Sequence, residues 1–281
     1  MDRLHQDFIK RFSLKNKVAI ITGGCGMLGI QHSEAIAEVG GIPVLFDLVD
    51  GTNEANRISK EYRTECLYIK GDVTSEKDVL NLVKLINKKF NKIDILINNA
   101  ALNPDPALDN SKLKNSLKRF ESYELNEWDL EMNVGLKGPF ICSKIIGENM
   151  SKNGGGVIIN ISSDLGLIAP DQRLYEINNT PSNKQPVKPV TYPIIKHGII
   201  GLTKFIATYW LGKNIRSNAL CAGGVYNSQP EEFINKISSY IPLGRMAQKD
   251  EYKSSIQFLC SDASKYMNGA CLVIDGGRSC W

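Results

Sequence analysis

Two side chains that could exchange a proton stand four positions apart in this sequence. They are Tyr192 and Lys196, in the segment YPIIK. If the segment is helical, both side chains lie on one face, one turn apart. A cation beside a tyrosine stabilises the phenolate and lowers the phenol pKa from its usual value of about 10. The pair is therefore a candidate for general acid–base catalysis.

A Y-x-x-x-K spacing is common in proteins, so a catalytic role for this pair needs support from its position in the chain. The apolar run 156–162 ends in Ser162 and Ser163, and Tyr192 and Lys196 open the next helical pattern. A serine hydroxyl at that point can donate a hydrogen bond to an oxygen on which charge develops. The ordinary alternative for Ser163 is a cap at the end of a strand.

A glycine-rich loop follows the first apolar run, residues 18–22. Gly24, Gly26 and Gly29 satisfy G-x-G-x-x-G between a strand-like run and a helical pattern. Such glycines allow a tight turn, and backbone amides at the helix start can then hold a pyrophosphate. The loop therefore predicts a dinucleotide site.

Asp47 ends the second apolar run, in VLFD. A carboxylate at this point can accept hydrogen bonds from the adenosine ribose, and it repels a 2′-phosphate. No Lys or Arg stands in the glycine loop or directly after Asp47. The sequence thus favours NAD(H) over NADP(H), with a simple turn residue as the alternative for Asp47.

The elements that must position these residues alternate between apolar runs and helical patterns. The runs are 18–22, 42–46, 66–70, 93–98, 156–162, 215–220 and 271–275, and the helical patterns are 28–39, 53–63, 76–90, 125–151, 192–211 and 248–260. Apolar runs without polar alternation are typical of strands covered on both faces. We predict an α/β fold in a single domain, 1–281: a doubly wound, parallel, seven-stranded Rossmann-type sheet with helices on both faces. Long loops at 102–122 and 169–190 follow strand ends, where such sheets bind ligands.

Composition excludes several other classes. The 281 residues carry a net charge of +4, with Lys and Arg scattered, so we expect no nucleic-acid partner. No apolar run is long enough for a membrane helix, and the N-terminus has no secretory apolar region. The seven cysteines and three histidines lack metal-ligand spacing. We expect no metal, no disulfide framework and a cytoplasmic protein.

With these motifs in order, the chain resembles the classical short-chain dehydrogenase/reductase family over nearly its whole length. The resembling segments are NNAA (98–101), GDV (71–73), EMNVGLKGPF (131–140), NISSDLG (160–166), RSNALCAGGV (216–225), PLGRMA (242–247) and GACLVIDGG (269–277). Within the family, IAPDQRLY and IDGGRSCW are most similar to oxidoreductases of flagellin-modification and surface-polysaccharide clusters. The resemblance implies that Asn133, Ser163, Tyr192 and Lys196 are catalytic. The cofactor contacts that it and the loop imply are Gly23, Gly24, Gly26, Met27, Leu28, Gly29, Asp47, Asp72, Val73, Asn99, Ala100, Tyr192, Lys196, Gly223 and Val225.

Three departures from the family pattern bear on these assignments. Met27 stands where the family has a glycine, and Gly23, Gly26 and Gly29 fit the TGxxGxxG spacing of the extended subfamily. Ala222 replaces a proline. The 29 positions between Ser163 and Tyr192 (192 − 163 = 29) exceed the family's usual spacing, because the proline-rich loop lies between them.

The expected function is NAD(H)-dependent interconversion of a secondary alcohol and a ketone on a small polar, sugar-like substrate. The alternatives are a sugar-nucleotide epimerase or dehydratase, and a non-catalytic nucleotide-binding protein. By resemblance we expect a homodimer or homotetramer. The loop after Ser163 is expected to act as a substrate lid, with candidate contacts from Gln172, Arg173, Tyr175, Lys184 and Lys188 beside Ser163 and Tyr192.

Overall fold

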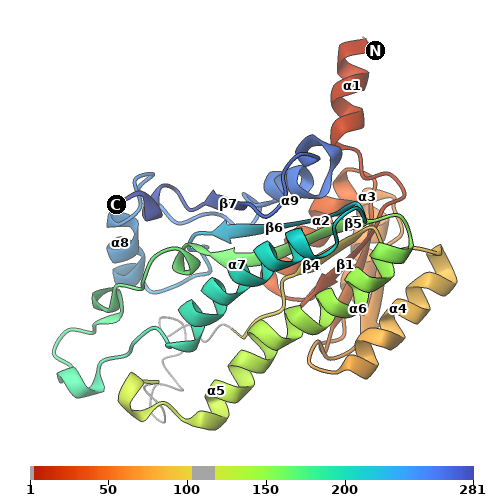
Figure 1. Ribbon diagram of the computed structural model, residues 1–281. Coiled ribbons are helices and arrows are strands. Elements are labelled where there is room, and N and C mark those ends of the chain that lie inside the picture. Colours follow the sequence, from red (N-terminus) through yellow and green to blue (C-terminus); the bar gives the residue numbers. More distant parts are fainter. Residues whose placement is uncertain (1–2, 103–117) are drawn as a thin grey trace.

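Seven parallel strands form one sheet in the computed structural model, which describes residues 3–102 and 118–281 (Figure 1). The strand order is β3-β2-β1-β4-β5-β6-β7. The strands are β1 (Val18–Thr22), β2 (Ile42–Asp47), β3 (Leu67–Lys70), β4 (Ile95–Asn98), β5 (Gly156–Ser163), β6 (Ile215–Ala222) and β7 (Cys271–Ile274). The α-helices are α1 (Arg3–Phe12), α2 (Met27–Glu38), α3 (Thr52–Tyr62), α4 (Glu76–Phe90), α5 (Leu125–Met132), α6 (Gly138–Lys152), α7 (Thr191–Tyr209), α8 (Glu231–Ser239) and α9 (Lys253–Cys260). The predicted sheet and fold class are confirmed.

Helices cover both faces of the sheet because successive strand side chains point to opposite sides. Val18 and Ile20 of β1 belong to a buried cluster with apolar side chains of α4 and α6. Ala19 and Ile21, the residues between, belong to another cluster with side chains of α2 and α9. In Figure 1, α4, α6 and α7 lie together on one face, and α2, α3 and α9 on the other. Because helices bury both faces of the sheet, the strand sequences are continuous apolar runs without polar alternation.

The candidate site lies beside β1, the strand at which the strand order reverses. Ile20 of β1 is paired with Val44 of β2 on one side and with Leu96 of β4 on the other. The helices after β1 and β4 leave toward opposite faces, which opens a crevice at the carboxyl ends of these strands. Ligands of open α/β sheets bind in that crevice.

Several segments differ from the sequence-based expectation. The helical pattern 125–151 consists of α5 and α6 joined by a π-helical turn, η2 (Asn133–Lys137). Within 169–190, the structure has two short 3₁₀ helices, η4 (Gln172–Tyr175) and η5 (Ser182–Lys184). Helices α1 and α8 were not predicted, and α1 projects from the body of the molecule (Figure 1). Of the expected loop 102–122, residues 103–117 lie outside the described residues. None of the helices within 3–102 and 118–281 has the length and apolar character to cross a membrane.

Candidate active site

A cavity of about 610 Å³ lies at the carboxyl ends of the central strands. Its volume is in the range of cofactor and small-molecule pockets. The predicted residues that line it are Gly23, Gly26, Met27, Leu28, Asp47, Asp72, Val73, Asn99, Ala100, Ser163, Tyr175, Tyr192, Lys196, Gly223 and Val225. Gly24, Gly29, Asn133, Gln172 and Arg173 are predicted residues that lie outside this lining. The cavity thus joins the glycine loop to the tyrosine and lysine.

The glycine loop is shaped by close backbone contacts. Gly23 has a φ of +61°, and a Cβ there would lie 2.8 Å from the Ala100 Cα. A Cβ on Gly29 would lie only 2.1 Å from the Gly23 carbonyl oxygen. Gly29 therefore contributes by letting α2 approach β1, and not by contacting a ligand. Met27 is the first residue of α2 and its side chain is partly exposed beside the cavity, so a side chain is tolerated there.

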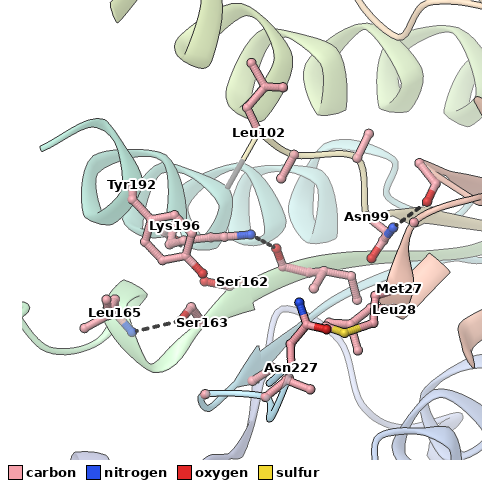
Figure 2. A pocket seen from close by; sticks show the side chains of 18 of the residues that line it. Met27, Leu28, Asn99, Leu102, Ser162, Ser163, Leu165, Tyr192, Lys196 and Asn227 are labelled. Carbon is pink, nitrogen blue, oxygen red and sulfur yellow. Dashed lines mark hydrogen bonds between the residues drawn. The ribbon is translucent and has the colours of Figure 1, made fainter. Parts of the chain in front are cut away.

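The residues after β4 hold this loop in place. Thr22 Oγ1 accepts hydrogen bonds from the Asn99 N–H at 3.0 Å and the Ala100 N–H at 3.1 Å. The Asn99 side chain donates to the Thr22 carbonyl at 3.0 Å and the Gly23 carbonyl at 3.1 Å (Figure 2). The NNAA motif therefore fixes the glycine loop while one side of it lines the cavity.

Asp47 lies where the sequence predicts, at the cavity edge. Its Oδ2 accepts the Cys25 N–H at 2.9 Å, and its Oδ1 accepts the Val49 N–H at 3.0 Å. These bonds fix the carboxylate between the glycine loop and the end of β2. Asp72 also lines the cavity, and its Oδ1 accepts both the N–H and the hydroxyl of Thr74 at 2.8 Å.

A nicotinamide dinucleotide fits this arrangement. The N-cap residue of α2 is Gly26, and no side chain caps the helix. Its amide groups and partial positive charge are therefore available to an anion at the cavity. The glycine loop and α2 would hold the pyrophosphate, and Asp47 the adenosine ribose.

The two residues of the predicted proton-transfer pair, Tyr192 and Lys196, lie in the first two turns of α7. Lys196 Nζ donates to the Ile161 carbonyl of β5 at 2.8 Å, and Ser162 Oγ donates to the Lys196 carbonyl at 2.8 Å. Figure 2 shows Tyr192 and Lys196 extending from α7 toward the end of β5. The ammonium of Lys196 lies 5.6 Å from the centre of the Tyr192 ring, and that of Lys188 lies 4.0 Å from it. Burial, with a smaller contribution from Lys188, lowers the pKa of Lys196 to about 8.

Ser163 completes this group at the end of β5. Its hydroxyl donates to Asp164 Oδ1 at 2.6 Å, and its Oγ accepts the Leu165 N–H at 3.2 Å (Figure 2). The other oxygen of Asp164 accepts Arg278 Nη1 at 2.7 Å, and both side chains are buried. Asp164 and Arg278 also line the cavity. Neither was a predicted site residue.

Asn133 is not brought to the cavity. It opens the π turn, where its carbonyl accepts the Gly138 N–H. Its side chain lies along an outer groove with Leu136 and Phe140, while its neighbour Val134 lines the main cavity. A catalytic role for Asn133 therefore stays a prediction.

Of the five loop residues singled out after Ser163, two lie at the cavity and three do not. Tyr175 and Lys188 line the cavity. Gln172 instead holds the backbone of Lys188, because its Oε1 accepts the Lys188 N–H at 2.8 Å and its Nε2 donates to the Lys188 carbonyl at 3.3 Å. Arg173, whose side chain is 75% exposed, forms a two-pronged ion pair with Asp171 and is not among the residues that line the cavity. Lys184 is exposed on η5.

The unpredicted helix α8 covers the same cavity. The Tyr175 ring packs against the Phe233 ring with centroids 5.6 Å apart, and Phe233 and Ile237 line the cavity. The spacing of Phe233 and Ile237, one helical turn, is the signal that indicates this short helix in the sequence.

Known proteins match nearly the whole chain. The family model described as short chain dehydrogenase matches residues 17–175, and that described as enoyl-(acyl carrier protein) reductase matches residues 181–279. An NAD-dependent glycerol dehydrogenase of Listeria innocua is 31% identical and covers 96% of this chain and 96% of its own length. An oxidoreductase of Thermotoga maritima is 30% identical, covering 95% of this chain and 99% of its own.

A solved structure shows the same arrangement of elements. It is a gluconate 5-dehydrogenase of Burkholderia cenocepacia in complex with NADP and tartrate, with a TM-score of 0.80, 25% identity, and coverage of 98% of this chain and 99% of its own. The closer likeness to flagellin-modification proteins stays a prediction. The protein is an enzyme that acts on a CH–OH group. The chain belongs to the classical short-chain dehydrogenase/reductase family.

Proposed function

We propose that the enzyme interconverts a secondary alcohol and a ketone with NAD(H), on a small polyhydroxylated, sugar-like substrate. The observation that carries the proposal is the single cavity that joins Asp47 and the glycine loop to Ser163, Tyr192 and Lys196. The Listeria and Burkholderia relatives are named for polar, hydroxyl-bearing substrates, which supports a similar class here.

The proton chemistry follows from the groups around Tyr192. A bound nicotinamide would supply hydride transfer to and from the substrate carbon. Tyr192 takes the hydroxyl proton during oxidation and gives it back during reduction. The buried ammonium of Lys196, with Lys188 on the ring face, favours negative charge on the phenol oxygen. Ser163 donates to the substrate oxygen as charge develops on it.

NAD(H) is the cofactor that Asp47 favours. Its carboxylate is held in place by the Cys25 and Val49 amides, so it cannot easily turn away from a ribose phosphate. Bringing a phosphate beside this carboxylate would place like charges together. Because relatives using NAD and NADP both occur, this preference is a proposal for this chain alone.

The direct test is oxidation of a panel of alcohols, followed by NADH absorbance. The panel contains polyols, aldonates, sugar phosphates and nucleotide sugars, each offered with NAD and with NADP. We expect NADH formation from at least one polyhydroxylated compound. Turnover without net NADH formation would support the epimerase or dehydratase alternative, and no turnover with tight cofactor binding would support the non-catalytic one.

Two wider proposals accompany this function. We propose a homodimer or homotetramer, supported by exposed apolar side chains on α6 and α7.

We also propose that the enzyme works in the reducing cytoplasm, because all seven cysteines are free thiols.

A further inference from the structure

The hydroxyl proton of Ser163 is already engaged in the ligand-free site. Ser163 Oγ donates it to Asp164 Oδ1 at 2.6 Å. A hydroxyl has one proton, and an ionised carboxylate only accepts, so this bond has one possible direction. Hydrogen bonds of this kind, with a charged acceptor, are stronger than those between neutral groups.

Asp164 forms a buried ion pair with Arg278. Arg278 Nη1 donates to Asp164 Oδ2 at 2.7 Å, and the two side chains are 7% and 3% exposed. Arg278 is itself fixed by its turn, because Asp275 accepts the N–H groups of Gly277 and Ser279 at 2.9 and 2.8 Å. The carboxylate therefore cannot leave Ser163 by swinging into solvent.

This geometry conflicts with the role of Ser163 in the proposed function. Ser163 must donate its proton to the reacting oxygen, yet doing so breaks the bond to Asp164 and leaves a buried carboxylate oxygen with fewer donors. A second substrate hydroxyl, on the carbon next to the reacting one, resolves the conflict. Its proton can replace that of Ser163 on Asp164. Oxygens on adjacent carbons are separated by about one hydrogen-bond length, similar to the Ser163–Asp164 spacing.

We propose that Asp164 determines specificity for vicinal diols. It accepts a hydrogen bond from the neighbouring hydroxyl of the substrate and thereby releases the Ser163 proton to the reacting oxygen. Arg278 positions Asp164 for this exchange. The inference rests on the proposed alcohol oxidation and narrows its substrate class to compounds with hydroxyls on adjacent carbons.

The test compares alcohols that differ by this one hydroxyl. The pairs are cis-1,2-cyclohexanediol against cyclohexanol, and 2,3-butanediol against 2-butanol. For each compound, kcat/KM is measured with NAD, and binding to the NADH-loaded protein, which cannot oxidise the alcohol, is measured by calorimetry. The wild-type enzyme should favour the diol by roughly 10- to 100-fold, which corresponds to the 1.5–3 kcal/mol typical of a hydrogen bond to a charged group.

The principal variant combines Asp164→Val with Arg278→Met, so that no buried charge is left without its partner. For this variant, the ratio of diol to mono-alcohol should fall to near one in both kcat/KM and binding affinity. The main cause should be higher kcat/KM and tighter binding for the mono-alcohol. Asp164→Asn is the more conservative second variant and should reduce the preference in part. Asp171→Asn removes a carboxylate charge of the nearby loop at a residue that does not line the cavity, and it should leave the preference unchanged.

The outcomes separate this inference from the proposed function. A wild-type protein that binds and uses both members of each pair equally, or binds no diol detectably, overturns the role of Asp164. So does a preference that survives in the folded Asp164→Val/Arg278→Met variant. If no alcohol yields NADH, the proposed function fails, and the calorimetric comparison still decides the role of Asp164.

Discussion

Tyr192 presents its ring to two ammonium groups, and its hydroxyl is the only part that exchanges a proton. Tyr192→Phe keeps the ring and its packing, so the fold and NADH affinity should persist. Turnover should fall by about 10²–10⁴-fold, the usual contribution of general acid–base catalysis. Steady-state kinetics and NADH fluorescence titration measure the two properties separately. Tyr209→Phe, at the exposed end of the same helix, is the control, and retained turnover in Tyr192→Phe would refute the assignment.

Asp47 is the residue on which we propose that cofactor choice depends. Asp47→Ala would remove the charge that we expect beside the 2′ position of the ribose. The preference for NADH over NADPH should narrow by about tenfold or more, because placing like charges together typically costs several kcal/mol. Fluorescence titration with both cofactors checks this. Asp50→Ala, an exposed carboxylate nearby, should leave the ratio unchanged, and equal affinities in the wild type would contradict the NAD assignment.

Lys196 gives the site a pH dependence. Its pKa is lowered to about 8, first by burial and then by the like charge of Lys188. A lysine carries its charge below its pKa, so a step that needs this ammonium should weaken as pH rises through about 8. Lys188→Met should raise the pKa of Lys196 and move the falling limb of kcat/KM to higher pH. Lys184→Met, which changes an exposed lysine on the same loop, is the control. If the falling limb of kcat/KM stays at the same pH in Lys188→Met, then Lys188 does not lower the pKa of Lys196.

Some of the candidate site residues are predictable from the sequence because they lie close to one another, or to a recognisable strand, in the chain. Tyr192 and Lys196 are one turn apart, and Ser163 directly follows a recognisable strand. The Asp164–Arg278 pair joins residues 114 positions apart, and no local pattern indicates it. Arg173 also could not be excluded from sequence, because its two-pronged bond to Asp171 depends on the turn that the loop adopts.

Helix α2 carries an unusual buried group on its sheet-facing side. His32 is completely buried, and neither ring nitrogen has a hydrogen-bond partner among the described residues. Burial lowers its pKa from 6.5 to about 4. Between these values the unfolded chain binds a proton that the folded protein does not, so the free energy of unfolding falls as pH decreases through this window.

The expected loss is about 2 kcal/mol between pH 7 and pH 5. Urea unfolding at the two pH values measures it. His32→Met keeps a buried apolar side chain without a titrating group, so its stability should fall less over the same range. Identical pH dependence in the two proteins would show that His32 does not contribute.

The elements themselves were predictable where their patterns are long. The starts of α2 and α7 lie within one residue of the expected positions, because a glycine turn and the segment before Tyr192 mark them. Helices α8, with nine residues, and α1, with ten, were missed, and in α8 the one-turn spacing of Phe233 and Ile237 is the signal that was available. Within the π turn at Asn133, Gly135 packs closely against Ile195 of α7, where a Cβ would lie 2.8 Å from Ile195 Cδ1.

The whole molecule exposes an apolar surface on α6 and α7. Phe205 and Tyr209 are 61% and 63% exposed, with stacked rings 5.4 Å apart, and Phe140 of α6 is also exposed. Ile199 and Ile206 of the same helix α7 are buried in the core. The exposed set is suited to a two-fold contact between copies of the chain, as in most homo-oligomers.

Phe205→Asp with Tyr209→Ser should therefore dissociate the assembly. Light scattering of the wild type should give the mass of a dimer or tetramer, and that of the variant a monomer. Phe8→Ser removes a similarly exposed aromatic side chain from α1 and should leave the mass unchanged. A monomeric wild type at micromolar concentration would refute the proposed interface.

The strand order also has a consequence for how the chain folds as it is synthesised. β2 and β3 add outward on one side of β1, but from β4 onward every new strand joins the same opposite edge, in the order in which it leaves the ribosome. At each stage of translation the nascent sheet therefore has β3 at one edge and its most recently made strand, in turn β4, β5 and β6, at the other. Such edges pair readily with other chains. A ribosome that stalls after β5 would hold the eight-residue strand Gly156–Ser163 open, with six residues that are buried in the finished enzyme. Chaperone demand should be highest during that interval, which ends when β6 pairs with β5.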